Sequence, residues 1–130
     1  MRTVLLLALA AVPFAFSQKK APQPKPPVIQ VVEVSAQRED GNLAIDLKLK
    51  NTGERTANEL KVIVDVLDSD KRVLTTQHGG SEPESVDAEN EAEFHAQMSL
   101  PPRAVYVRFS FEEQGGRDLK ASNTGPFPIE

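Results

Sequence analysis

Leu-Ala-Ile-Asp-Leu-Lys-Leu-Lys, residues 43–50, alternates between an aliphatic side chain and a small or charged one. Successive side chains of a β-strand point to opposite faces, so this stretch gathers its Leu and Ile side chains on one face. An amphipathic helix would instead repeat its apolar residues every three or four positions. Residues 43–50 therefore predict a strand with one face in a core and the other in water.

The same period of two occurs in three further stretches, residues 60–67, 94–100 and 105–111. In residues 60–67 and 105–111 the predicted inward positions are Leu60, Val62, Val64, Val66, Val105, Val107, Phe109 and Phe111. In residues 94–100 they are Phe94, Ala96, Met98 and Leu100. These alternations indicate a protein built from strands, because no helical stripe has this spacing.

Weaker strands are expected at Val28–Ser35, Val73–Gln77 and Leu119–Ser122. The clearest turn sequences between strands are Asp40-Gly41-Asn42, which suits a tight hairpin, and Gly115-Gly116. Seven short strands predict an all-β fold, a single immunoglobulin-like antiparallel β-sandwich over residues 28–130. A small barrel is the alternative. The sequence has no cysteine and no tryptophan, so aliphatic and phenylalanine packing must hold the core.

The N-terminus has the layout of a secretory signal peptide, residues 1–17. An apolar run, Val4–Val12, precedes Ala15-Phe16-Ser17, which places small residues at the −3 and −1 positions of a cut before Gln18. The run is too short to span a bilayer, which takes about 20 residues. We expect a mature chain without a transmembrane segment, exported to the periplasm or the extracellular space. The alternative is a buried N-terminal core segment.

A lysine- and proline-rich arm, residues 18–27, follows the predicted cleavage site. Its three lysines and four prolines predict an extended, disordered segment, because proline fixes φ and has no N–H to donate. The arm is either a spacer or a contact to an acidic surface, lipid headgroups or cell-wall polymer. Residues 28–130 contain 11 basic and 19 acidic side chains, a net charge of −8, which argues against nucleic-acid binding.

One turn and the strand after it resemble a known family. Leu49-Lys50-Asn51-Thr52-Gly53-Glu54 is followed by an apolar strand that ends at Asp68. This arrangement resembles the FxLYD family of bacterial extracytoplasmic domains, in which Asn-Thr-Gly follows one strand and an aspartate ends an apolar one. Only Asp68 matches the naming motif literally, because Val64, Val66 and Leu67 stand where the family has Phe, Leu and Tyr. The resemblance implies an immunoglobulin-like sandwich without catalytic residues.

Candidate catalytic groups are few. His78 precedes Gly79-Gly80 in a predicted loop, and His95 lies on the polar side of a predicted strand. Neither lies near a serine in a recognisable nucleophile elbow, and a hydrolase needs its base within hydrogen-bond reach of the nucleophile. The sequence therefore predicts a protein that is not an enzyme and carries no cofactor.

The segment Glu82–Glu93 is acidic, and no lysine or arginine occurs anywhere from Val73 to Leu100. Calcium takes six to eight oxygen ligands, so the carboxylates of Asp87, Glu89 and Glu91 are candidate ligands. No Asp-x-Asp-x-Asp-Gly loop is present, which favours a solvated strand face over a metal site. Asp68 and Asp70 are likewise spaced as ligands are, and they also suit a simple turn.

Several apolar residues fall on the predicted outer faces of their strands, namely Ile63, Leu67, Ile29 and Val31. Either loops or strand crossings cover them, or they form an exposed patch for a partner. Phe127 and Ile129 near the C-terminus either cap a sheet edge or dock as a short peptide. Ile63, Leu67, Phe127 and Ile129 are the candidate partner-binding residues.

These observations favour a non-catalytic, exported binding or assembly module of the bacterial cell envelope. Its partner is expected to be another envelope protein, bound at a sheet edge or a loop surface, with main-chain pairing as one mode. The alternative is a small-ligand or calcium-binding domain that uses the acidic segment Glu82–Glu93.

Overall fold

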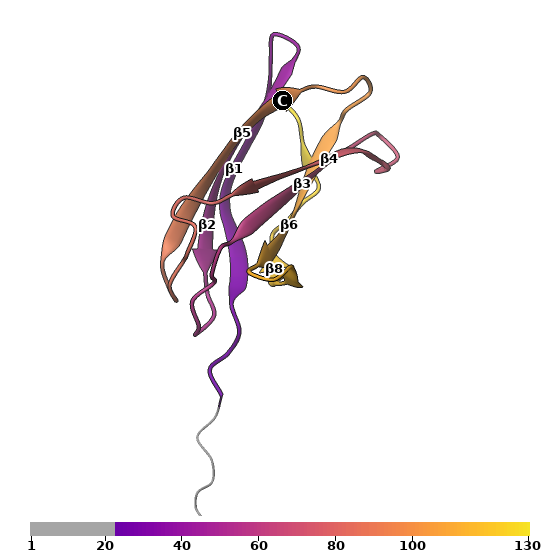
Figure 1. Ribbon diagram of the computed structural model, residues 1–130. Helices are drawn as coiled ribbons and strands as arrows, with labels where there is room; N and C mark the ends of the chain where they lie inside the picture. The colour runs from indigo at the N-terminus through magenta and orange to yellow at the C-terminus, as the bar shows by residue number, and fades with distance from the viewer. Residues whose placement is uncertain (1–22) are drawn as a thin grey trace, which may run out of the picture.

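The computed structural model describes residues 23–130, all of them in strands, turns or irregular segments. Two β-sheets pack face to face, and the described chain begins at the end of the molecule opposite the C-terminus (Figure 1). The predicted all-β sandwich is confirmed. The predicted signal peptide and residues 18–22 of the predicted arm lie outside the described residues.

One sheet, here called the β2 sheet, has the strand order β5 (Glu91–Ser99), β2 (Asn42–Asn51), β1 (Val28–Glu39), β8 (Lys120–Ser122). The other, the β3 sheet, has the order β4 (Val73–Gly80), β3 (Lys61–Leu67), β6 (Tyr106–Glu113), β7 (Arg117–Asp118), and β9 (Phe127–Pro128) also pairs with β6. Every pair is antiparallel except β1 with β8. The two-residue strands β7 and β9 are additions to the seven predicted strands.

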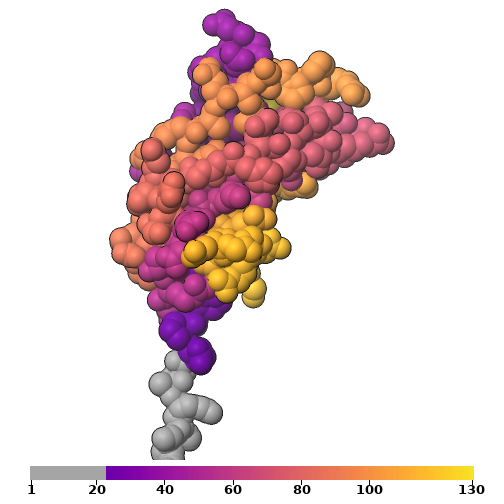
Figure 2. Space-filling model, viewed as in Figure 1, coloured from indigo at the N-terminus to yellow at the C-terminus, as the bar shows by residue number. Residues whose placement is uncertain are grey.

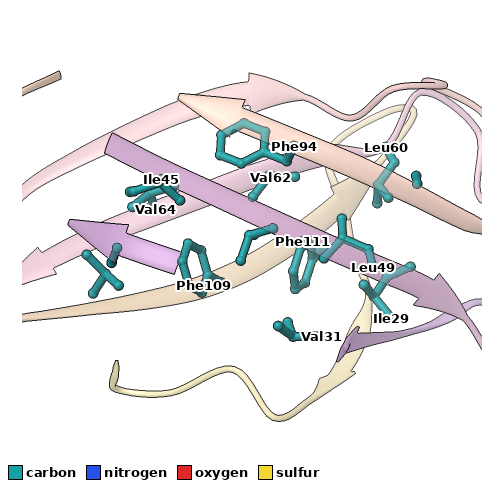
Figure 3. Packing of buried hydrophobic residues seen from close by; sticks show 14 of the residues in the cluster. Ile29, Val31, Ile45, Leu49, Leu60, Val62, Val64, Phe94, Phe109 and Phe111 are labelled. Atoms are coloured by element: carbon teal, nitrogen blue, oxygen red, sulfur yellow. The ribbon is translucent and has the colours of Figure 1, made fainter. Parts of the chain in front are cut away.

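The core lies between the inner faces of the two sheets (Figure 3). The alternating residues of β2, β3 and β6 all point into it, and the fully buried ones include Ile45, Val62, Val64 and Phe111. Removing a Val, Leu or Phe side chain from water contributes about 1.5–3 kcal/mol. The period of two in the sequence thus corresponds directly to the packing that holds the sheets together.

The first strand departs from the prediction. Ile29 and Val31, which were expected on the outer face, are buried in the core. A β-bulge between Val31 and Glu33 shifts the register of β1 against β2. Because a bulge adds one residue to one strand, it reverses the alternation, and Ala36 is the buried residue beyond it.

The C-terminal residues join the two sheets along one side. Ile129 N–H donates to the Val105 carbonyl (2.9 Å), and Glu130 N–H donates to the Ala36 carbonyl (2.9 Å). The segment that contains β7 and β8 makes a second crossing, since β7 pairs with β6 and β8 with β1. The side of the sandwich between β1 and β6 is therefore closed at both ends, whereas β4 and β5 are the outermost strands on the other side.

Asn51, at the end of β2, is fully buried, and its side chain binds two other chain segments, the turn after β2 and the loop before β5. Its Nδ2 donates to the carbonyls of Arg55 and Val86 (both 2.9 Å), and its Oδ1 accepts from Gly53 N–H (3.0 Å). Gly53 in turn packs against Pro26, with so little space that a Cβ would lie 2.2 Å from the Pro26 carbonyl oxygen. The end of the predicted arm is thus anchored against this turn.

We predict that Val64→Asp unfolds the domain. Val64 has no exposed surface, and an unpaired carboxylate at this position costs as much as the whole stability of a small domain, about 5–15 kcal/mol. Val32→Asp is the matched control, because Val32 is 40% exposed. Circular dichroism of the two variants checks this, and a cooperative melt of Val64→Asp near the wild-type temperature would contradict it.

We also predict that Asn51→Ala lowers the free energy of unfolding by about 2–4 kcal/mol, because it leaves two carbonyls and one N–H without partners. Asn58→Ala, at an exposed position of the next loop, should change stability little. Urea unfolding measures both variants. Equal effects of the two substitutions would show that the Asn51 contacts are unimportant.

Candidate functional site

The outer edge of β5 is largely unpaired (Figure 1). Near its start, the Glu93 N–H and C=O bond to the backbone of Glu82 (2.9 and 2.8 Å), on the side away from β2. An antiparallel strand alternates the direction of these groups, so those of His95, Gln97 and Ser99 face the same way. Within residues 23–130 they have no backbone partner on that side.

The inner face of β5 is covered only in its first half. Ala92 and Phe94 are buried, with 2% and 3% of their surface exposed. Ala96, Met98 and the following Leu100 pack against the core but remain only partly buried. The unpaired part of the edge therefore coincides with incompletely covered apolar side chains.

The outer face of the β2 sheet carries a small charged cluster beside this edge. His95 Nδ1 lies 2.5 Å from Asp46 Oδ1, and His95 Nε2 lies 3.2 Å from Glu93 Oε1. Shallow hollows of about 190 and 380 Å³ lie on the two sides of the His95–Asp46 pair. The smaller hollow also borders Lys48 and Glu33. The larger hollow borders Ala44, whose side chain is too small to fill it.

The two carboxylates raise the pKa of His95 above its ordinary value of 6.5, first through the hydrogen bond with Asp46 and second through that with Glu93. All three side chains are more than half exposed. The cluster is therefore a surface ion pair that forms when the imidazole is protonated, and no serine or threonine hydroxyl is hydrogen-bonded to the ring among the described residues.

The predicted calcium ligands are not brought together. Asp87 accepts a hydrogen bond from the Thr56 hydroxyl (2.9 Å), Glu89 pairs with Lys50 (3.5 Å), and Glu91 is exposed at the start of β5. In the part of the chain from residue 23 onward, no group of three or more His, Asp or Glu side chains could hold a metal ion.

Asp68 occupies a turn. Its Oδ1 accepts from the N–H groups of Arg72 and Asp70 (both 2.9 Å), and the first of these bonds is the main reason why the pKa of Asp68 is lowered. Residues 23–130 contain no helix that is long and apolar enough to cross a membrane.

The four candidate partner-binding residues have different environments. Leu67 is fully buried although it lies outside the main core cluster, and Ile129 is 7% exposed within the core, so neither contributes to an exposed patch. Leu67 pairs with Val73 and Tyr106 at the end of β3, next to a bulge. Phe127 packs on Phe109, with ring centroids 6.0 Å apart, and is half-buried, as is Ile63.

The position of β5 at the edge of its sheet was not predicted from the sequence. The sequence pattern placed Ala96 and Met98 correctly on an inward face, but the alternation of one strand does not say whether a neighbour lies beyond it. The available signal was the absence of lysine, arginine and proline from Phe94 to Leu100, since exposed edges are usually protected by such residues.

No protein-family model matches this chain, and no curated protein matches it. Among solved structures, it is similar to IrmA from Escherichia coli, at 11% sequence identity and a TM-score of 0.47. The likeness covers 83% of this chain and 99% of IrmA. A structural similarity at this level of sequence identity does not indicate the function of this protein.

We predict that the His95 ring titrates above pH 6.5 and that Asp46→Asn lowers its pKa more than Glu93→Gln does. Because the folded pKa is the higher one, the stabilisation by the ion pair is fully present below the unfolded pKa of about 6.5 and is lost as pH rises through the folded value. An NMR titration of the ring measures this. A wild-type midpoint at or below 6.5 would refute it.

Proposed function

We propose that this protein is a non-catalytic, exported module of the bacterial cell envelope that binds another envelope protein by strand addition at β5. The observation that carries the proposal is the coincidence, on one edge, of unpaired backbone groups at His95, Gln97 and Ser99 with half-covered apolar side chains. In strand addition the main chain supplies affinity, and alternate side chains supply specificity.

The chemistry of the edge indicates what the partner strand contains. Its inward side chains would cover Ala96 and Met98 and are therefore apolar. Its outward side chains would lie near Glu93 and the acidic segment before it, where no basic residue occurs from Val73 to Leu100. Complementary charge favours lysine or arginine at those positions. The partner segment is an extended strand that alternates apolar and basic residues.

Export and the absence of catalysis are parts of the same proposal. Export is supported by the signal-peptide layout of residues 1–17 and by the FxLYD resemblance of residues 49–68. A non-catalytic role is supported by the surroundings of His95, whose two ring nitrogens contact carboxylates and no nucleophile.

The test replaces Gln97 with proline or with alanine. Proline removes the outward N–H and is tolerated on an exposed edge, whereas alanine keeps the N–H and removes the same exposed side chain. The probes are peptides of about ten residues that alternate valine with lysine or valine with glutamate. We expect the Val-Lys peptide to shift and protect the amides of His95, Gln97 and Ser99 in NMR spectra.

Gln97→Pro should abolish this binding at an unchanged melting temperature, and Gln97→Ala should retain it. The Val-Glu peptide should bind at least about tenfold more weakly. In cross-linking from the native envelope, the same partner should be lost with Gln97→Pro and kept with Gln97→Ala. Equal capture by both variants, or peptide binding that leaves the β5 amides unchanged, would reject the proposal.

A further inference from the structure

The proposed contact edge contains one side chain that changes its charge near neutral pH. Among the three residues of β5 whose outward backbone groups are unpaired, His95, Gln97 and Ser99, only His95 has an ionisable side chain. Its ring lies on the outer face of the β2 sheet, in contact with Asp46 of β2 and Glu93 of β5. In Figure 2, residues 82–99, in salmon to orange, lie along the left side of the molecule.

The strand pairing arranges the charged side chains around His95 in rows, each made of residues directly opposite one another on neighbouring strands. In the row of His95, Asp46 lies opposite it on β2, and Ser35 follows on β1. From β1, Glu39 also faces the larger hollow beside His95. The neighbouring row consists of four charged residues, in the order Glu33, Lys48, Glu93 and Glu82. Of these charged neighbours of His95, only Lys48 is basic.

Glu82 shows where a residue of an added strand lies. Its backbone bonds to that of Glu93 on the free side of β5 (2.8 and 2.9 Å), so it occupies the position beyond Glu93 in that row. The chain then leaves β5, since the Ser81 N–H donates to the Leu60 carbonyl (3.3 Å). A strand added at the unpaired part of the edge would take the corresponding position in the next row. One of its outward side chains would lie beside His95, with the two Cβ atoms about 4.5–5.5 Å apart.

We propose that protonation of His95 weakens the contact at β5, so that the partner strand binds most tightly when the imidazole is neutral. This inference rests on the proposed function, because it concerns the basic outward side chains expected of that partner. Like charges directly opposite each other destabilise paired strands. An imidazolium at His95 therefore repels a lysine or arginine beside it.

Protonation also determines whether the two carboxylates are available to the partner. The imidazolium donates one N–H to Asp46 (2.5 Å) and the other to Glu93 (3.2 Å), so both carboxylates are paired within the protein. A neutral imidazole has a single N–H and leaves one of the two carboxylates without this donor. That carboxylate can then pair with a basic side chain of the added strand. Because the carboxylates raise the pKa of His95, Asp46 more than Glu93, the change is centred above pH 6.5 in the free protein.

The test measures the affinity of the Val-Lys peptide, with blocked termini, at about pH 5.5 and about pH 8.5 and at constant ionic strength. We expect the dissociation constant of the wild-type protein to be about fivefold higher at the lower pH. The Val-Glu peptide should show the opposite dependence, because an imidazolium attracts its carboxylates. Saturation with the Val-Lys peptide should also lower the pKa of the His95 ring in an NMR titration, since the coupling of two binding events is reciprocal.

Three variants assign the effect to the charge of His95. His95→Gln has no titratable ring and should reduce the change in affinity to less than about twofold. His95→Lys carries a permanent charge and should bind the Val-Lys peptide weakly at both pH values. His78→Gln removes the only other histidine, which lies on β4 of the other sheet, and should keep the wild-type pH dependence. Equal melting temperatures of the variants exclude unfolding as the cause.

The outcomes separate this inference from the proposed function. Binding of the Val-Lys peptide to the β5 edge with the same affinity at both pH values would overturn the inference and leave the proposed function intact. A pH dependence that persists in His95→Gln would do the same. No binding at either pH value, in a protein whose His95 ring still titrates, would reject the proposed function and this inference with it.

Discussion

The buried side chain of Asn51 makes the contacts on which one end of the sandwich depends. It binds the turn after β2 through Gly53 and Arg55, and the loop before β5 through Val86. Its main chain also pairs with Glu89 and Asn90 of that loop. Because the chain has no disulfide, these hydrogen bonds fix the loop that places Glu82 beside Glu93. The point at which the edge of β5 becomes free therefore depends on contacts made at the end of the neighbouring strand, β2.

Closure of the sandwich is unequal on its two sides, and this inequality leaves the edges of β4 and β5 outermost. Between β1 and β6, the C-terminal segment crosses from sheet to sheet twice. Its N–H groups donate hydrogen bonds to the carbonyls of Ala36 and Val105. On the other side the segment after β4 reaches β5, where the backbone of Glu82 bonds to that of Glu93. Strand addition requires unpaired edges, so the proposed contact is expected where the fold leaves its backbone hydrogen bonds incomplete.

Electrostatics bears on the proposed contact at β5. The edge of β5 follows an acidic segment and has no basic residue near it in sequence. In the proposed strand addition, basic side chains of the partner would balance this charge.

The strands and several of the turns follow from local patterns in the sequence. The alternation of residues 43–50 and 60–67 is a local property, and so is the Asp40-Gly41 turn, where both residues have the positive φ that a two-residue hairpin needs. The bulge that turns Ile29 inward, the burial of Leu67 and the positions of β4 and β5 at the sheet edges depend on the tertiary structure. Strand order and cover depend on contacts between distant residues, and side-chain periodicity does not record them.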